Sequence, residues 1–348
     1  MEYVLPYLNS YLLGHEEAEQ LFLQAWKNKS LHNSWLIGGN EGIGKATFAY
    51  KAARFLLAAD ENDCDKYHSL DIAPDNQVFR LVANRSHPDL KIIERDFIDT
   101  DKKKIIKAIK DGEAMSDEQL QSLKKSAVIK VDDVRTINEF LSKKSFDGNW
   151  RIVIVDSADD LNPSSANAIL KILEEPPARS LIFLISHNPY RLLPTIRSRC
   201  AKLTLQPLPK EKVATLLRRY MPELSETEVG GLAQISGGSI GRALNYAQNK
   251  ALSIYLQLEK LLNNSIDFDL SSAIELCNNA AGNEDVWNLV CELLSRFVSD
   301  MLKRGVKIKE LSATWDNAAK MLRDAENLNM DKKQTLILII VALRKALA

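Results

Sequence analysis

The sequence predicts a three-layer α/β domain with a mainly parallel sheet, followed by a region that contains only helices. Three observations lead to this prediction. Apolar strands alternate with amphipathic helices from Glu16 to about residue 206. A short apolar strand, a glycine-rich loop and a helix follow one another directly between Ser34 and Leu56. After Pro207 the strand pattern stops, and only helical periodicity remains.

The apolar and charged periodicities place the elements of this α/β domain. We expect helices at 16–26, from Lys45 through Leu56, at about 131–143 and from Asn162-Pro163 to before Pro176-Pro177, and strands at 34–38, 90–93, 151–156, 181–185 and 201–205. Residues 60–88 are polar and are expected to be irregular. Unbroken β-branched strands such as 151–156 are typical of a sheet that is buried on both faces.

Residues 97–130 are charge-dense and poor in large apolar residues, so we expect a surface insertion. Ile105, Ile106 and Ile109 indicate one lysine-rich helix there, and Ser116 with Gln119 resembles the capping box of another. The lysines could contact phosphates, but a solvated helical face is the stronger interpretation. The predicted domains are a core at 1–206, a small helical domain at 207–250 and a helical domain at 251–348.

Composition narrows the class of protein. Lysine plus arginine equals aspartate plus glutamate at 46 each, so no overall basic excess indicates nucleic-acid binding. The four cysteines form no C-x-x-C pair, which favours a reducing compartment. The N-terminus lacks a basic, apolar leader, and the longest apolar run, Leu336–Leu343, is too short to span a bilayer. We expect a cytoplasmic protein without a membrane contact.

The stretch from Gly39 to Thr47 nearly matches the phosphate-binding pattern G-x-x-x-x-G-K-[ST]. Gly39, Gly44 and Lys45 fit, and Gly42 adds a further flexible position inside the loop. Ala46 stands where the pattern has the hydroxyl that holds Mg²⁺, and Thr47 lies one position further round the helix. The sequence therefore predicts a phosphate cradle without its metal ligand.

A second departure lies at the end of the strand 151–156. Asp156 supplies the acid that ATPases of this architecture use for Mg²⁺, but the next position, where a catalytic glutamate is expected, is Ser157. Asp159 or Asp160 could act as the base only through a distorted turn. We therefore expect no hydrolysis by this chain, although weak, passive binding of ATP or ADP remains compatible with the loop.

Four blocks of the sequence resemble those of a known family. These blocks are GIGKAT at 42–47, NAILKILEEPP at 167–177, TIRSRC at 195–200 and GSIGRAL at 238–244. Together they resemble the clamp-loader branch of the AAA+ proteins over roughly residues 10–250, without the insertion. The resemblance implies an AAA+ P-loop core, a helical lid at 207–250 and a helical collar at 251–348. Members of this branch assemble as an open five-membered ring with ATP bound between neighbours.

The resemblance also implies roles for single residues. Arg199 corresponds to an arginine finger that acts in trans on the ATP of a neighbouring subunit, with Ser198 and Cys200 shaping its turn. The alternative for Arg199 is a cap on the helix before strand 201–205. Arg242 corresponds to the sensor arginine of the lid, and Ser186 to the first sensor position, where a hydroxyl or an amide contacts the phosphate. The alternatives are that Arg242 only links the lid to the core and that Ser186 is a simple strand terminus.

Members of this branch usually carry a zinc module of four cysteines after the phosphate-loop helix. Here that interval holds only Cys64 and His68, with Asp63 and Asp65 nearby. Zinc sites seldom combine one cysteine and one histidine with two such acids, so we expect no zinc and no required cofactor.

The leading hypothesis is a non-hydrolysing stator of the replicative clamp loader, within the holoenzyme of a DNA-directed DNA polymerase. Its expected partners are the motor ATPase and wrench subunits, the sliding clamp indirectly, and primer-template DNA within the complex. One alternative is an active motor of the same loader, with Thr47 or water replacing the lost metal ligand. Another is a AAA+ DNA-remodelling ATPase outside clamp loading, which the missing groups and the Ser-Arg-Cys block disfavour.

Overall fold

The computed structural model describes residues 5–110, 123–143, 145, 150–263, 269–328 and 330–348. The chain divides into two compact units, each considered by itself. The first consists of Met1–Pro222 and Gly237–Gly241, and the second of Glu223–Ser236 and Arg242–Ala348. The predicted division into three domains at residues 206 and 250 stays a prediction.

The first unit is built on a five-stranded sheet in the order β2-β3-β4-β1-β5. Every neighbouring pair in it is parallel, as the sequence predicts. The strands are β1 (Ser34–Gly38), β2 (Leu90–Glu94), β3 (Arg151–Asp156), β4 (Ser180–Ser186) and β5 (Ala201–Thr204). Because all strands point the same way, the carboxyl ends of β1, β3 and β4 lie at the same edge of the sheet.

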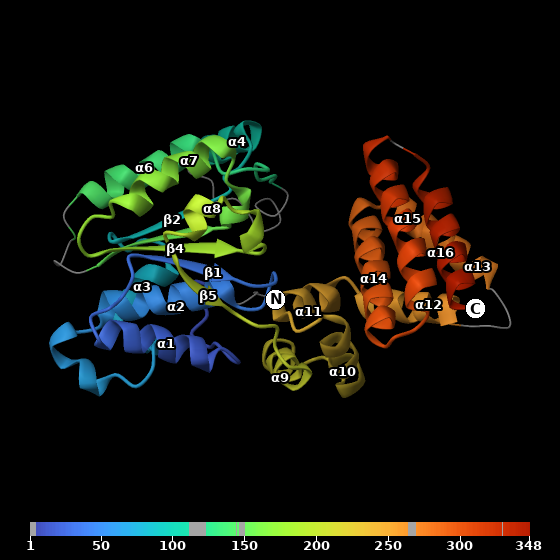
Figure 1. The fold of residues 1–348 in the computed structure, drawn as a ribbon, viewed down its shortest axis with the longest axis horizontal. Helices are drawn as coiled ribbons and strands as arrows, with labels where there is room; N and C mark the ends of the chain where they lie inside the picture. The colour runs from blue at the N-terminus through green and yellow to red at the C-terminus, as the bar shows by residue number, and fades with distance from the viewer. Residues whose placement is uncertain (1–4, 111–122, 144, 146–149, 264–268, 329) are drawn as a thin grey trace. The chain divides into compact units, whose positions relative to one another are not determined.

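Helices cover both faces of this sheet, which confirms the predicted three-layer core (Figure 1). One apolar cluster joins α1 and α2 to one face, and a second joins α6 and α7 to the other. The unit contains α1 (Glu16–Lys27), α2 (Lys45–Ala58), η1 (Glu61–Lys66), α3 (Gln77–Ala83), α4 (Asp99–Lys110), α6 (Val131–Ser142), η2 (Ala158–Asp160), α7 (Pro163–Glu174), η3 (Pro189–Arg191), α8 (Pro194–Arg197) and α9 (Lys210–Tyr220).

The local signals at α7 are confirmed. The side chain of Asn162 accepts a hydrogen bond from the Ser165 amide, and Pro163 occupies the first turn, where no intrahelical amide bond is lost. The prediction that residues 60–88 are irregular was wrong, because this stretch contains η1 and α3. Asn76 caps α3, and the helix buries Phe79 and Val82, which gives a short polar segment enough apolar contact to be helical.

The predicted insertion is described in part. Helix α4 lies where the isoleucine pattern indicates it, and Phe97 forms an antiparallel bridge with Lys125. The predicted capping box of Ser116 and Gln119 lies outside the described residues.

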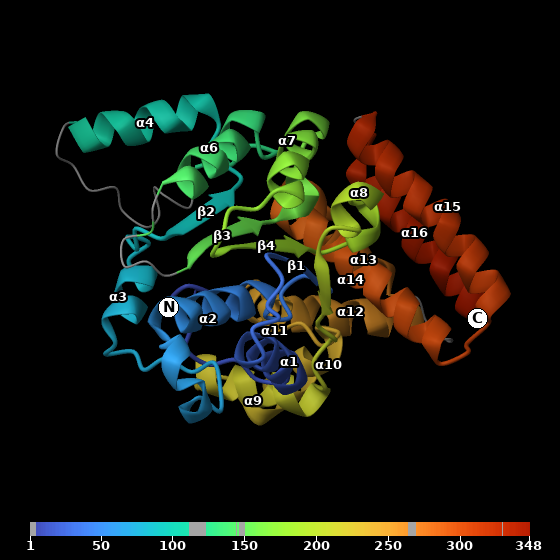
Figure 2. The same ribbon diagram turned by 60° about the vertical axis from the view of Figure 1, so that its left-hand side comes forward.

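The second unit is helical throughout its described residues, and α15 and α16 lie side by side (Figure 2). Its helices are α10 (Glu226–Ile235), α11 (Ile240–Gln248), α12 (Ala251–Asn263), α13 (Leu270–Gly282), α14 (Glu284–Lys303), α15 (Ile308–Asn327) and α16 (Lys332–Leu347). The side chains of Ser225 and Glu228 form a capping box at the start of α10. In neither unit does a helix of the described ranges have both the length and the apolar character needed to cross a membrane.

Candidate functional site

The phosphate loop connects β1 to α2, in the strand–loop–helix order that the sequence predicts. Gly39, Gly42 and Gly44 all have positive φ angles, of 142°, 73° and 108°. Gly44 lies immediately before α2, and at its φ angle a side chain would strain the backbone. The loop therefore has the backbone geometry of a cradle at a helix N-terminus, where an anion is favoured.

Lys45 is buried beneath this loop. Its ammonium donates to the carbonyl oxygens of Gly39 at 2.7 Å and Asn40 at 2.6 Å. Burial lowers the pKa of Lys45 to about 8, although the charges of Asp156 and Glu41 favour the protonated form. The side chain thus places its positive charge against the loop backbone, within the region where a phosphate would be held.

Two positions around the expected Mg²⁺ site lack the side chains of the ATPase pattern. Ala46 packs its methyl group against the apolar cluster under the sheet, and Thr47 is buried in α2. Asp156 ends β3, and burial raises the pKa of its carboxyl group. The Ser157 hydroxyl donates to the Asp159 carboxylate at 2.8 Å. Position 157 therefore offers no carboxylate, and its hydroxyl hydrogen is already bonded.

Three contacts that the sequence did not predict hold the loop backbone from outside. The ring of His15 donates from Nε2 to the Ile43 carbonyl at 2.7 Å. The Ser239 hydroxyl donates to the Glu41 carbonyl at 2.8 Å, and the Gly241 amide donates to the Gly42 carbonyl at 2.9 Å. At Gly241 a Cβ atom would lie 2.9 Å from the Gly42 Cα atom, so this close approach depends on glycine. Burial lowers the pKa of His15, which favours the neutral ring.

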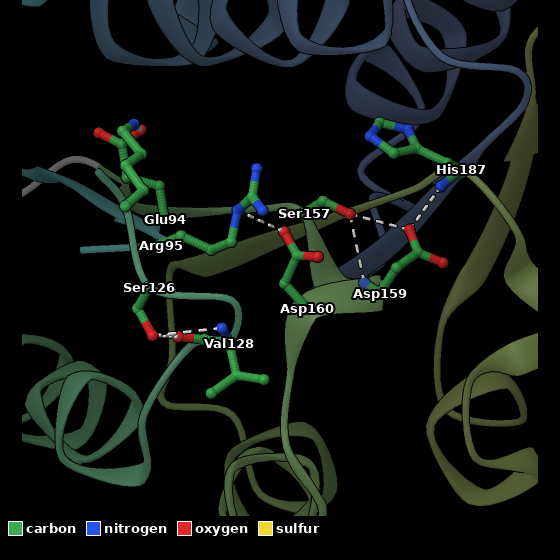
Figure 3. Close-up of polar contacts among 9 residues, drawn as sticks. Glu94, Arg95, Ser126, Val128, Ser157, Asp159, Asp160 and His187 are labelled. Atoms are coloured by element: carbon green, nitrogen blue, oxygen red, sulfur yellow. Dashed lines mark hydrogen bonds and ion pairs between the residues drawn. The ribbon is translucent and has the colours of Figure 1, made fainter. Parts of the chain in front are cut away.

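Ser186, the expected first sensor, ends β4 and is fully buried. Its hydroxyl donates to Asp159 Oδ1 at 2.9 Å. Figure 3 shows Asp159 between Ser157 and the backbone of His187. The neighbouring Asp160 turns the other way and pairs with Arg95 at 3.2 Å. Asp159 was considered from the sequence only as a replacement base, and its bonding to four donors instead makes it a structural acceptor.

Arg199 follows α8 in the turn that leads into β5. Its guanidinium pairs with the Glu174 carboxylate at 2.7 Å and donates to the Thr195 carbonyl at 2.9 Å. The bond to Thr195 is the helix-capping contact of the alternative interpretation, and the arginine-finger role stays a prediction. About a third of the side chain (34%) is exposed at the surface.

The residues flanking Arg199 hold its turn in place. The Ser198 hydroxyl donates to the same Thr195 carbonyl at 3.1 Å. Cys200 is buried, which raises the pKa of its thiol to about 12 and leaves it an inert apolar contact. Arg197 stacks over the ring of the exposed Tyr190, with 5.7 Å to the ring centroid. The turn that carries Arg199 is thus held by a local hydrogen bond and a buried neighbour.

Arg242, the expected lid sensor, lies in the first turn of α11. Its guanidinium pairs with Glu292 of α14 at 2.7 Å and donates to the Ser236 carbonyl at 3.2 Å. Within the second unit, the pair with Glu292 joins α11 to α14, a connection that the sequence did not indicate. The sensor role of Arg242 stays a prediction.

The interval that could have held zinc shows ordinary local bonding. The Cys64 thiol donates to the Glu61 carbonyl at 2.9 Å. Over the ranges that the structure describes, no three His, Cys, Asp or Glu side chains are grouped to hold a metal ion. The absence of zinc stays a prediction.

Comparison with known proteins shows which family this chain resembles. The family model described as "DNA polymerase III, delta subunit" matches residues 14–209. The DNA polymerase III subunit delta' of Pseudomonas aeruginosa is 30% identical over 208 residues, 60% of this chain and 53% of the relative. The subunit of the same name from Escherichia coli is 40% identical over 114 residues, 33% of this chain and 34% of the relative. The four sequence blocks resemble this subunit, delta-prime, and that recognition is confirmed.

Among solved structures, a DNA polymerase III gamma subunit-related protein from Thermotoga maritima aligns with 94% of this chain and 100% of its own, at 20% identity and a TM-score of 0.40. The chain spans about half the length, or less, of the curated relatives it matches.

Proposed function

We propose a function from one premise: the chain belongs to the DNA polymerase III delta-subunit family. It acts as the stator of a clamp loader, a subunit that does not hydrolyse ATP itself and donates Arg199 to the ATP site of a neighbouring subunit. It thereby helps to load the sliding clamp on primed DNA during replication.

One observation above all supports the proposal, namely the contrast between the two reactive regions of the chain. At its own loop, Ala46 lacks the metal-binding oxygen and Ser157 lacks the carboxylate that would polarise water. Arg199, in comparison, has a partly exposed side chain on a turn held by buried neighbours. This contrast supports a role in trans over hydrolysis in cis.

The pairing of Arg199 with Glu174 is compatible with a role in trans. Both side chains are partly exposed, at 34% and 49%, and such surface pairs contribute roughly 0–1 kcal/mol. The ATP γ-phosphate of a neighbour could therefore replace Glu174 at small cost. A guanidinium placed there offsets the charge that develops in the phosphoryl-transfer transition state, an effect of about 10³- to 10⁵-fold in rate.

The rest of the proposal concerns binding. The degenerate loop holds ATP or ADP weakly, through its amides and Lys45, without requiring Mg²⁺. The partners are the motor and wrench subunits of the loader, the sliding clamp through them, and primer-template DNA inside the complex. Helices α12 to α16 form the share of the collar that this subunit contributes, and the assembly works in the cytoplasm.

The competing function, an active motor of the same loader, is tested on the purified chain. We expect no Mg²⁺-dependent ATP turnover above a protein-free blank. A turnover that Lys45→Ala abolishes and that Lys103→Ala leaves intact would contradict the stator proposal. Lys103 is a suitable control because its side chain is exposed on α4, away from the loop.

A further inference from the structure

The carboxylate of Asp159 lies at the junction between two neighbouring strand ends. Asp159 belongs to η2, directly after β3, and three of its four donors come from the end of β4 and the two residues that follow. Oδ1 accepts from the Ser186 hydroxyl at 2.9 Å and the Asn188 amide at 3.1 Å, and Oδ2 accepts from the His187 amide at 2.6 Å. The Ser157 hydroxyl adds a fourth bond to Oδ2 at 2.8 Å (Figure 3).

Four donors on one carboxylate make a strong local clamp. Hydrogen bonds to a charged acceptor are shorter and stronger than neutral ones. Burial disfavours the charged form of Asp159, but the His187 amide and the Ser157 and Ser186 hydroxyls outweigh it and lower the pKa of the carboxyl group. Asp159 is therefore ionised at neutral pH and holds the segment 186–188 as an anion.

The hydroxyl of Ser186 has a single hydrogen to donate. At the first sensor position, as the family resemblance implies, that hydrogen would be directed to a nucleotide phosphate. Here it is directed to the Asp159 carboxylate, which is also an oxyanion. The chain supplies from its own sequence the kind of charge that a bound nucleotide would supply.

The clamped segment leads directly to the arginine finger. After Asn188 the chain passes through η3 and α8 to Arg199, with Leu192 and Ile196 buried along the way and Cys200 buried directly after Arg199. Pro189 packs against the end of β1, where a Cβ atom on Gly38 would lie 2.7 Å from the proline ring. A segment that is fixed at its start and packed along its length can transmit its position to Arg199.

We propose that Asp159 is a positioning residue that substitutes internally for a nucleotide phosphate, so that the segment 186–199 presents Arg199 correctly whether or not this chain binds a nucleotide. The inference rests on the proposed function of Arg199. The Asp159 carboxylate holds the segment 186–188 permanently, and Arg199 is positioned without a nucleotide bound to this chain.

The test uses Asp159→Asn in the full-length chain. An amide keeps one acceptor oxygen but turns NH₂ donors toward groups that are themselves donors. Asp160→Asn is the matched control, because it makes the same change one residue later in an acid that bonds to Arg95. Hydrogen exchange of the peptide covering 186–199 reports directly on the clamp, since the His187 and Asn188 amides donate to Asp159.

We expect Asp159→Asn to exchange roughly tenfold faster over 187–199 than the wild type and Asp160→Asn. We also expect wild-type exchange in this peptide to be the same with and without ADP. Unchanged exchange in Asp159→Asn, or protection that appears only with ADP, would overturn the inference. If Asp159→Asn does not fold, Ser186→Ala removes one donor from the same carboxylate, and unchanged exchange there has the same meaning.

A second measurement connects the clamp to catalysis. In a reconstituted loader, Asp159→Asn should lower kcat of ATP turnover, by up to about 100-fold at the site that Arg199 serves, because an ångström of misplacement can cost that much. The KM for ATP should change little. In a double variant with Arg199→Ala, Asp159→Asn should not lower kcat any further. A further fall in kcat would show that Asp159 does not act through Arg199. If Arg199→Ala alone has no effect, the finger proposal fails, while the exchange result still decides the role of Asp159.

Discussion

The guanidinium of Arg242 and the carboxylate of Glu292 lie 2.7 Å apart and join α11 to α14. The pair is partly exposed, at 30% and 44%, so its contribution to the free energy of unfolding should be about 0.2–1 kcal/mol. We predict a coupling energy of that size between Arg242→Ala and Glu292→Ala in a double-mutant cycle by urea unfolding. Coupling within error of zero would show that the pair does not join the two helices in solution.

Arg54 is a buried cation that fastens the N-terminal segment to α2. It donates to the Tyr7 carbonyl at 3.1 Å and the Asn9 carbonyl at 2.6 Å, and lies 4.5 Å from the centroid of the Phe79 ring. Removing the guanidinium leaves these carbonyls without their charged donor. We predict that Arg54→Met lowers the free energy of unfolding by about 2–4 kcal/mol.

The matched control for this prediction is Arg135→Met. Its side chain is 68% exposed and forms a surface pair with Asp132, so the change should stay within about 0.5 kcal/mol. If urea unfolding shows the same loss in free energy of unfolding for both variants, the structural role assigned to Arg54 is contradicted.

The lowered pKa of Lys45 predicts how the degenerate loop responds to pH. The side chain is charged below about pH 8 and becomes neutral above it, because burial disfavours the ammonium. A phosphate favours the charged form, so binding above pH 8 requires the uptake of a proton. We predict that ADP affinity, measured by calorimetry without Mg²⁺, falls as pH rises from 7.5 to 9.5.

Lys45→Arg separates this effect from other titrations, because its guanidinium stays charged throughout this range. Its affinity for ADP should be independent of pH, whatever its absolute value. A wild-type affinity that is flat across the range would show that Lys45 does not hold the phosphate.

Much of the first unit could be predicted from sequence because its signals are local. The strand, glycine loop and helix around Lys45 follow one another directly, and Asn162-Pro163 marks the start of α7 by its own chemistry. Helix α3 was missed because it is short and lies in a polar stretch. Its stability comes from burying Phe79 and Val82, which depends on tertiary contacts rather than on local periodicity.

The candidate site was predicted less completely, because its key bonds join residues that are distant in sequence. Asp159 meets Ser186 only because β3 and β4 are adjacent and parallel, and Arg242 meets Glu292 through the packing of α11 with α14. His15 reaches Ile43 in the same way. The sequence showed acids at the end of β3 and a hydroxyl at the end of β4, but the strand order that pairs them was needed to identify the clamp.

The central claim is that Arg199 acts on ATP bound by a neighbouring subunit. Its most direct test is ATP turnover by a loader reconstituted with this chain and the motor and wrench subunits from the same source, in the presence of clamp and primed DNA. Arg191→Ala is the control, since Arg191 is exposed in η3 of the same segment. We predict that Arg199→Ala removes the turnover of the served site, about 10³-fold or more there, while assembly by size-exclusion chromatography is unchanged. Turnover equal to that of the wild type and of Arg191→Ala would contradict the claim.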